Sequence, residues 1–433
     1  MRPSRPVIAS CLALAVLAGL TVSTGPAAAS GFGLFQHGGR AMGQVGAFTA
    51  RASEPSALTY NPAAIVRLDG FQAQAGLDFN NAEDDYASST SNFSARHVIQ
   101  FPAHAYATWK PEDLPFALGI GVDSPFYYVA NWDPRLFPGR FLTRRVELRV
   151  YEAHPVLAYD LGDGWSIGGG MRYVFGSLAQ EDNVNFGLLV PGSSGLTTVE
   201  VERDASADVD DIGWDVALHY ADTAWGWGAV YRSPIQLKGD GDLTYRARDT
   251  DPGNSALQDA IRQRFRNGTA SQAFEIPREL RGGIWIAPYP ELRLELDASY
   301  QGWSSLENTD VTYTPDAIEQ GPTYRTRRDW DDTLSLRLGL EGDINERVMM
   351  YGGVAFEPSP VPDSTVEPGF PRGDAWVYGL GASYNFPHIS FDVGYSRHEH
   401  EGRGAPRQEP NPTIDGRYVS TDQVWGFSVR WRN

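Results

Sequence analysis

The sequence predicts an all-β fold, a transmembrane antiparallel β-barrel of about 14 strands with an N-terminal segment inside its lumen. Three observations lead to this prediction. Apolar and polar residues alternate over most of the chain, and short and long connections alternate between the apolar–polar runs. A segment rich in Gly and Ala, with neither helical nor strand period, precedes the first run.

The alternation is clearest in three runs, 292–300, 334–340 and 389–395. In the first run the even positions are mostly apolar, whereas Glu295 and Asp297 share the other face with further polar residues. Charged side chains at mid-strand are costly in a dry core and favourable in a wet lumen. Aromatic residues gather near the ends of several runs, where a barrel meets the two membrane interfaces.

The connections follow the pattern of bacterial outer-membrane barrels, in which short periplasmic turns alternate with long outer loops. We expect short turns at Pro111–Leu114, Leu161–Gly164, Ala221–Ala224, Pro288–Pro290, Asp343–Glu346 and Pro387. We expect long loops at Asn80–Arg96, Pro125–Arg145, Ser177–Asp208, Ser233–Arg278, Ser304–Trp330, Glu357–Asp374 and His398–Thr421. The predicted location is therefore the outer membrane of a Gram-negative cell.

The N-terminus has the features of a secretory signal peptide at residues 1–29. Arg2 and Arg5 precede an apolar run at 7–20, and Ala27 to Ala29 form a small-residue cleavage site. Residues 30–69 then form the segment expected in the lumen, a hatch, and residues 70–433 form the barrel. The single cysteine, Cys11, lies within the signal, so we expect no disulfide in the mature chain.

Composition and motifs argue against several function classes. A formal charge of −18 and a pI near 4.8 disfavour nucleic-acid binding, which requires clustered basic residues. No histidine stands in a nucleophile elbow or a zinc-protease motif, so we expect no enzyme activity and no cofactor. His398 and His400 flank Glu399 and could bind a metal, but a solvated loop is the more ordinary reading.

One expected outer loop carries an amphipathic helix. Leu257, Ile261 and Phe265 are spaced four residues apart and follow a capping pair, Asn254-Ser255. The apolar side of this helix could bind a hydrophobic ligand at the mouth of the barrel, or it could simply pack on other loops.

Several motifs, in this order and spacing, resemble the FadL/TodX family of outer-membrane transporters for hydrophobic compounds. They are the Ser-Gly-Phe start at residue 30, Gly39-Arg40-Ala41, Gly46-Ala47, Asn61-Pro62-Ala63, Asn131-Trp132, Gly139-Arg140-Phe141, 165–170, 329–333 and 359–363. The resemblance implies a barrel of 14 strands. It also implies a ligand caught among the loops, a pocket above the hatch, and passive lateral release through the wall. By the same resemblance, Gly31, Phe32, Asn61, Pro62 and Ala63 belong to the hatch and its gating.

Three arginines are candidates for binding an acidic ligand. By alternation Arg172, Arg232 and Arg337 face the lumen, where they can anchor a carboxylate or pair with neighbouring acids. The chain departs from the fatty-acid members of the family at Glu181 and Asp182, where those members are basic. This departure counts against a carboxylate ligand and leaves neutral hydrocarbons open. We expect the cargo to be a long-chain fatty acid or a related neutral or aromatic hydrocarbon.

A structural or adhesin-type barrel is the alternative. Its long acidic loops, including 80–85 and 240–251, would bridge divalent cations to lipopolysaccharide. The hatch segment favours the transporter. We expect a monomer whose partners are outer-membrane lipid, lipopolysaccharide and a hydrophobic small molecule.

Overall fold

The computed structural model describes residues 36–189, 196–247, 255–317, 321–404 and 416–433. Within these residues, 14 antiparallel strands pair in a closed ring, as the sequence predicted. In ring order the strands are β1 (Gly70–Ala87), β4 (Ala103–Lys110), β5 (Phe116–Asn131), β6 (Arg145–Gly162), β7 (Trp165–Leu189), β8 (Leu196–Ala221), β9 (Trp225–Arg232), β12 (Glu279–Tyr289), β13 (Leu292–Gln301), β16 (Thr333–Asp343), β17 (Val348–Glu357), β18 (Ala375–Asn385), β19 (Ile389–His400) and β21 (Arg417–Arg432). The ring closes where β1 pairs with β21 from Gln72 to Ala87.

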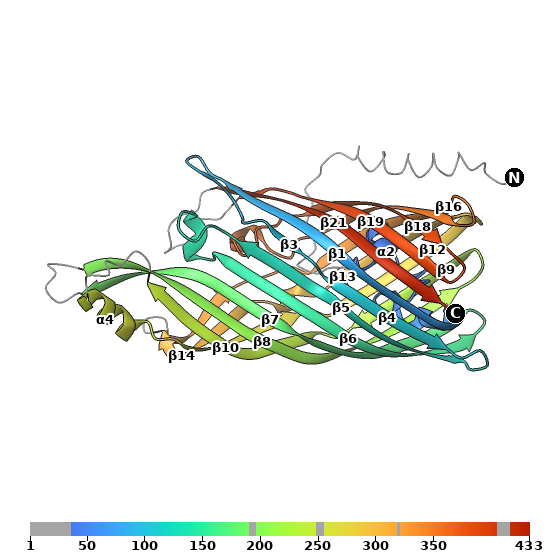
Figure 1. Cartoon of the computed structure of the whole chain (residues 1–433), viewed down its shortest axis with the longest axis horizontal. Helices are drawn as coiled ribbons and strands as arrows, with labels where there is room; N and C mark the ends of the chain where they lie inside the picture. The colour runs from blue at the N-terminus through green and yellow to red at the C-terminus, as the bar shows by residue number, and fades with distance from the viewer. Residues whose placement is uncertain (1–35, 190–195, 248–254, 318–320, 405–415) are drawn as a thin grey trace.

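The outer half of the barrel is longer than the sequence predicted. Much of 177–208, expected to be a loop, is instead a strand pair, because β7 and β8 continue in register as far as Leu189 and Leu196. This extension projects beyond the barrel, with α4 (Ser255–Arg264) beside it (Figure 1). Further strands of this end are β2 (Asn92–Ser94), β3 (Val98–Gln100), β10 (Ile235–Ala247), β11 (Gly268–Ile276), β14 (Asn308–Ala317), β15 (Gly321–Arg327) and β20 (Arg403–Gly404), with short helices η2 (Pro138–Phe141), η3 (Trp303–Ser305) and η4 (Asp363–Thr365).

Side chains point alternately to the membrane and to the lumen. Leu296 on β13 is 53% exposed, whereas the adjacent Asp297 is 3% exposed. Exposed Leu, Ile, Phe and Trp side chains continue around the ring, and an apolar surface of this extent marks a lipid-facing wall. None of the helices in the described ranges has the length and apolar character of a membrane-spanning helix.

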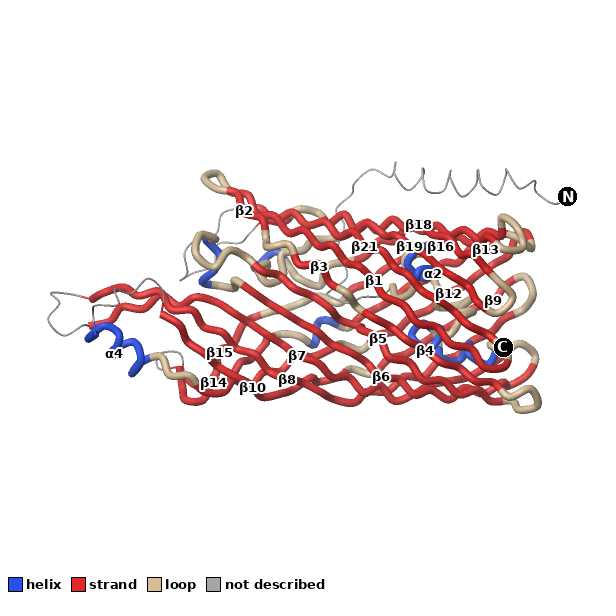
Figure 2. The backbone as a smooth tube through the Cα atoms, in the orientation of Figure 1, coloured by secondary structure: helices blue, strands red, loops and turns tan. Residues whose placement is uncertain are grey.

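Residues 36–69 lie inside the barrel, and we call this described part of the chain the hatch. It consists of α2 (Gly39–Gly43), α3 (Ala57–Tyr60) and η1 (Pro62–Arg67), joined by turns. The helix α2 packs on β17, β18, β19 and β21, whereas η1 packs on β4 to β8 on another part of the wall. Figure 2 shows these helices within the ring of strands. Most side chains of this segment are buried against the barrel, because the segment alone has too little apolar surface to form its own core.

A large apolar cluster lies in the half of the lumen toward the long loops. Its aromatic members come from β1, β5, β11, β21 and the long connections, and they include Tyr86, Phe126, Tyr128, Trp132, Phe137, Phe274, Trp303, Trp330, Phe370 and Tyr418. Several of these residues stack directly, such as Trp132 on Phe137 with ring centroids 4.5 Å apart. The interior between the hatch and the outer loops is thus largely apolar.

Candidate functional site: the hatch, its cavity and the adjoining wall

The backbone of the hatch is held by two carboxylates of β13. Asp297 Oδ2 accepts hydrogen bonds from the amides of Phe48 (3.0 Å) and Thr49 (2.9 Å). Glu295 Oε1 accepts from the amides of Ala50 (2.6 Å) and Arg51 (3.3 Å). These four N–H groups are buried, and the two carboxyl groups supply the hydrogen-bond acceptors that buried amides require. These bonds fix the position of residues 48–51, which have no regular secondary structure, in the lumen.

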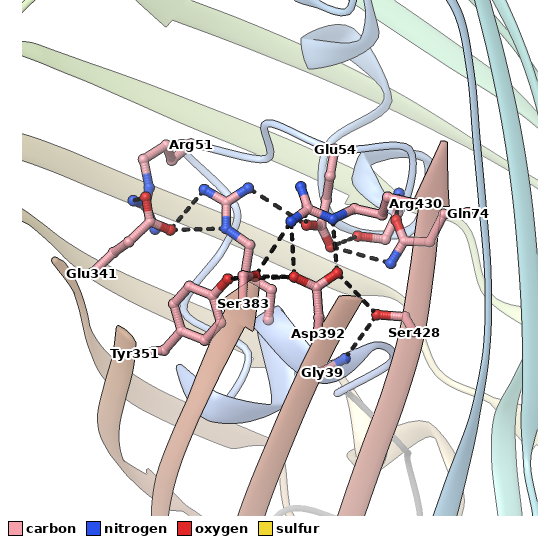
Figure 3. A network of polar contacts seen from close by, with 12 residues as sticks. Gly39, Arg51, Glu54, Gln74, Glu341, Tyr351, Ser383, Asp392, Ser428 and Arg430 are labelled. Atoms are coloured by element: carbon pink, nitrogen blue, oxygen red, sulfur yellow. Dashed lines mark hydrogen bonds and ion pairs between the residues drawn. The ribbon is translucent and has the colours of Figure 1, made fainter. Parts of the chain in front are cut away.

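A second anchor is the buried carboxylate of Glu341 on β16 (Figure 3). It lies 2.6 Å from Arg40 Nη2 and 2.7 Å from Arg51 Nη1, two arginines of the hatch. Arg293 of the wall also donates to Glu341, at 3.0 Å. Burial lowers the pKa of Arg40, but Glu341 and Glu54 raise it by more, so the net shift is upward and the guanidinium stays charged. Hatch and wall are therefore joined by an ion network rather than by apolar packing alone.

On the opposite side of α2, the network continues to β19 and β21. Arg430 Nε donates to Asp392 at 2.7 Å, and Arg430 Nη1 lies 3.4 Å from Glu54 of the hatch. Ser428 Oγ accepts from the amide of Gly39 at 3.2 Å (Figure 3). At Gly39 a Cβ atom would lie only 2.7 Å from the backbone of Asp392, so this approach requires glycine.

Asn61, predicted as a hatch residue, links two parts of the hatch to the wall. Its Nδ2 donates to the carbonyl of Thr49 at 3.0 Å and to that of Leu218 on β8 at 3.3 Å. Its Oδ1 accepts from the amide of Ala63 at 3.1 Å and so caps η1, which Pro62 begins. Ser166 Oγ donates to the carbonyl of Ala63 at 2.9 Å. The structure therefore brings Asn61, Pro62 and Ala63 together at the wall.

A cavity of about 30 Å³ lies between the hatch and the apolar cluster, with room for about two water molecules. Its lining combines charged and apolar side chains: His37, Thr59, Pro125, Phe126, Arg172, Arg232, Ile276, Pro277, Glu279, Arg281 and Gln301. Two of the predicted ligand-binding arginines, Arg172 and Arg232, meet here. Arg337 is not part of this lining and instead lies 3.0 Å from Glu357.

The arginines of the cavity differ in how fully they are paired. Arg172 forms a bidentate pair with Glu152, at 2.7 Å and 3.1 Å, and Arg281 lies 2.7 Å from Glu279. Arg232 Nη2 donates to the carbonyl of Thr59 at 2.7 Å. Its Nε makes no hydrogen bond among the described residues, although it lies 4.0 Å from Asp215 Oδ2. Arg232 is therefore paired less closely than Arg172 or Arg281.

The wall beside the cavity has a break in its strand pairing. In the described chain, β5 pairs with β4 only from Leu118 to Val122, and its register on β6 shifts between Asp123 and Phe126. Pro125, which has no N–H to donate, lies within this shift. We call residues 123–130, the part of β5 beyond its pairing with β4, the seam.

The hatch is bonded to the wall at the start of the seam. Thr59 Oγ1 donates to Asp123 Oδ2 at 2.5 Å, and Tyr106 Oη on β4 donates to the same oxygen at 3.0 Å. Leu58 of α3 lies directly against Gly119 of β5, where any side chain would collide with it. Cavity, hatch and seam therefore meet at one place.

The predicted loop helix is present as α4, and its apolar side is covered. Leu257 and Ile261 are buried with Val199 and Val201 of the β8 extension. Phe265 packs on Tyr245 of β10, with ring centroids 5.4 Å apart. This packing agrees with the structural alternative that the sequence left open; a ligand at these residues stays a prediction.

The acidic residues at which the chain departs from its fatty-acid relatives lie outside the cavity. Glu181 lies 2.7 Å from Arg145, and Asp182 lies 2.5 Å from Arg203, in the extended part of β7 and β8. Their charges are thus matched locally. Two other predicted hatch residues, Gly31 and Phe32, lie outside the described residues.

Sequence reasoning missed the carboxylates Glu295, Glu341 and Asp392 as hatch anchors. The alternating pattern placed all three on the lumen side, but it did not indicate a partner. It also missed a wide vestibule of about 940 Å³ beneath the hatch, lined by arginines and acids including Arg67, Arg293, Arg432, Glu291 and Asp343. This vestibule lies at the short-turn end, the periplasmic side of such barrels.

A closed 14-stranded barrel with an apolar outer wall and a folded internal hatch defines an outer-membrane β-barrel of the plugged type. The model of the outer membrane protein transport protein family (OMPP1/FadL/TodX) matches residues 20–432. The chain belongs to this family and is an outer-membrane protein.

Named relatives match either most of the chain or about two-fifths of it. The long-chain fatty acid transport protein of Escherichia coli K12 is 23% identical over 388 residues, covering 83% of this chain and 84% of the relative. Alkane uptake protein A of Marinobacter nauticus is 26% identical over 193 residues, 42% of this chain and 37% of its own length.

Solved structures share the fold. A Pseudomonas aeruginosa FadL homologue superposes with a TM-score of 0.81 at 20% identity, covering 93% of this chain and 99% of the other. The Ralstonia pickettii toluene transporter TbuX superposes with a TM-score of 0.67 at 17% identity, covering 92% and 99%.

Proposed function

We propose that the protein takes up hydrophobic small molecules passively across the outer membrane, with long-chain fatty acids or related hydrocarbons as cargo and without chemical change to them. Membership of the outer-membrane transport family supports this proposal. So do the names of the relatives, which include a long-chain fatty acid transporter, an alkane uptake protein and a toluene transporter.

The single observation that carries the proposal is the meeting of cavity, hatch and seam. Phe126 lines the cavity and belongs to the seam, while Thr59 of the hatch lines the same cavity and bonds to Asp123. A molecule that reaches the cavity therefore stands beside the break in the wall. Lateral exit there would deliver an insoluble molecule to the outer leaflet instead of to water.

The apolar cluster supports capture from the outer loops. Each methylene that leaves water for this interior contributes about 0.8 kcal/mol, so a long alkyl chain gains enough to compete with detergent or lipid. The cavity is too small for such a chain as it stands. Loading therefore requires the hatch to move, and the Gly-rich backbone of residues 38–46 allows such movement.

The cargo can belong to two chemical classes, which differ in whether the molecule carries a carboxylate. Arg232 Nε suits a carboxylate, as in a fatty acid, because a buried guanidinium forms strong charge-assisted hydrogen bonds. A neutral alkane or arene would use Phe126 and Ile276 alone. We propose that both classes share the route and that the fatty acid binds more tightly.

Deletion of Pro125 tests the lateral step. Ser124 and Pro125 stand opposite Tyr151 alone, so β5 carries one extra residue here, and removing one residue removes the register shift. β5 can then continue as a regular strand, which closes the seam. Uptake of a labelled fatty acid by cells should fall to the level of a strain that lacks the protein. A matched deletion of one residue from the exposed turn 344–347 should leave uptake unchanged. Normal uptake by a folded seam deletion would refute lateral release.

A further inference from the structure

Three metal-binding side chains meet where the hatch touches the barrel wall. His37 belongs to the hatch, Asp78 to β1 and His104 to β4. Their ligand atoms all lie within 4.8 Å of one another. The three residues are 1%, 2% and 3% exposed, so the cluster is buried within the lumen.

The distances suit one tetrahedral ion. Asp78 Oδ2 lies 3.3 Å from His37 Nδ1 and 3.7 Å from His104 Nδ1. Two ligands of a tetrahedral zinc ion, each about 2.0–2.2 Å from it, stand about 3.3–3.5 Å apart. The two separations from Asp78 therefore match this value to within a few tenths of an ångström, and modest side-chain movement would bring all three atoms around one ion.

The cluster also leaves buried polar atoms without hydrogen-bond partners. Within the described part of the chain, both ring nitrogens of His104, Nε2 of His37 and Oδ1 of Asp78 have no hydrogen-bond partner. Buried polar groups in folded proteins are nearly always satisfied, so atoms of this kind gathered at one point indicate that something binds there.

The surroundings hold the two imidazoles in position. His104 stacks on Tyr106, with ring centroids 5.7 Å apart, and its ring occupies the space that a side chain on Gly76 would fill. The amide of His37 donates to Tyr60 Oη at 2.8 Å. Supports of this kind orient metal ligands in advance and raise metal affinity.

We propose that His37, Asp78 and His104 bind one divalent transition-metal ion of the Zn²⁺ class. Two imidazoles and one carboxylate are a common ligand set for a zinc site with an open fourth position. His37 also lines the cavity, so a space with room for water lies next to the cluster. The ion joins the hatch to two wall strands close to the seam. If transport follows the route proposed above, metal binding slows it by fastening the hatch.

Metal binding is measured on the mature full-length barrel, purified in detergent without a histidine tag and stripped with a chelator. Calorimetric titration with ZnCl₂ should show about one ion per chain, and Co²⁺ should give the visible absorption bands of a tetrahedral site. His104→Gln and Asp78→Asn should each weaken binding at least about tenfold. The control His219→Gln changes another buried wall histidine that contacts the hatch, through the carbonyl of Ala50, and should bind zinc like the wild type.

X-ray absorption on the zinc-loaded wild type tests the ligand set without relying on any variant. Two imidazoles and oxygen ligands in the first shell are expected. A ligand shell without imidazole overturns the proposal. So does a wild-type protein that binds no zinc, and so do variants that bind zinc as tightly as the wild type. Failure of the uptake proposal would leave these results untouched, because the measurements involve no transport.

Discussion

Glu341→Gln removes the charge that holds two hatch arginines, and it should loosen the hatch without unfolding the barrel. Glutamine has nearly the shape of glutamate but leaves Arg40 and Arg51 partly uncompensated in a buried site. Breaking a buried ion pair in this way costs about 3–5 kcal/mol. Arg40 keeps Glu54 at 3.4 Å and Arg51 keeps Glu295 at 3.6 Å, so the low end, about 3 kcal/mol, applies.

Hydrogen–deuterium exchange of the detergent-solubilised protein measures this loss directly. About 3 kcal/mol corresponds to an approximately hundredfold fall in the protection of hatch amides. The amides of Phe48, Thr49 and Ala50 report on the hatch, because wall carboxylates hold them in place. Amides of the barrel strands should keep their protection.

Asp343→Asn is the matched control, since Asp343 lies two residues away and also contacts Arg293, at 2.7 Å. Its side chain is partly exposed, so the change should cost less than about 1 kcal/mol. The reasoning is refuted if hatch protection is equal in the two variants, or if hatch and strands lose protection together.

Three further predictions concern the hatch, the cavity and the outer loops. Asn61→Ala removes three hydrogen bonds and costs the hatch about 2–3 kcal/mol. Uptake should slow, while the heat-modifiable band of the folded barrel on gels stays unchanged. Normal uptake at equal surface abundance would contradict this prediction. Arg232→Gln should lower uptake of a fatty acid more than uptake of its methyl ester, and an equal loss for both would remove Arg232 as the carboxylate anchor. Burial and the neighbouring Glu401 raise the pKa of Asp374 to about 7. The folded loop therefore binds this proton more tightly than the unfolded chain does, and its stability should fall as pH rises from about 4 to about 7 and then change little. The Glu401 amide donates to the Asp374 carbonyl at 2.6 Å, so its hydrogen exchange, corrected for intrinsic rates, measures the stability of the loop. Asp374→Asn should abolish the pH dependence of this stability.

The barrel itself could be predicted because a strand has only two faces. Once Leu296 is assigned to the membrane, Asp297 must point into the lumen, and the structure agrees. The same rule correctly placed Arg172 and Arg232 inside. Strand ends were harder. Val199 and Val201 of the extended β8 do alternate with acidic residues, but the stretch 177–208 is rich in charged residues and was interpreted as a loop.

The contacts of the hatch could not be predicted, because they join residues far apart in sequence. Asp297 binds amides about 250 residues away, and local patterns carry no information on that pairing. The metal cluster likewise draws on positions 37, 78 and 104, which come together only when the hatch enters the closed ring. The pairing of Arg172 with Glu152 required the register of two strands, which alternation alone does not determine.

Movement of the hatch is the central claim, and a reversible cross-link tests it most directly. Met42 Cβ lies 3.4 Å from the position of a Cβ on Gly426 of β21, close to the separation of about 3.5–4.5 Å in a disulfide. Cys11 is the single natural cysteine, so a Met42→Cys/Gly426→Cys pair can be cross-linked selectively. Uptake of a labelled fatty acid should fall at least about tenfold on oxidation and recover on reduction. Unchanged uptake by fully cross-linked protein would contradict the account.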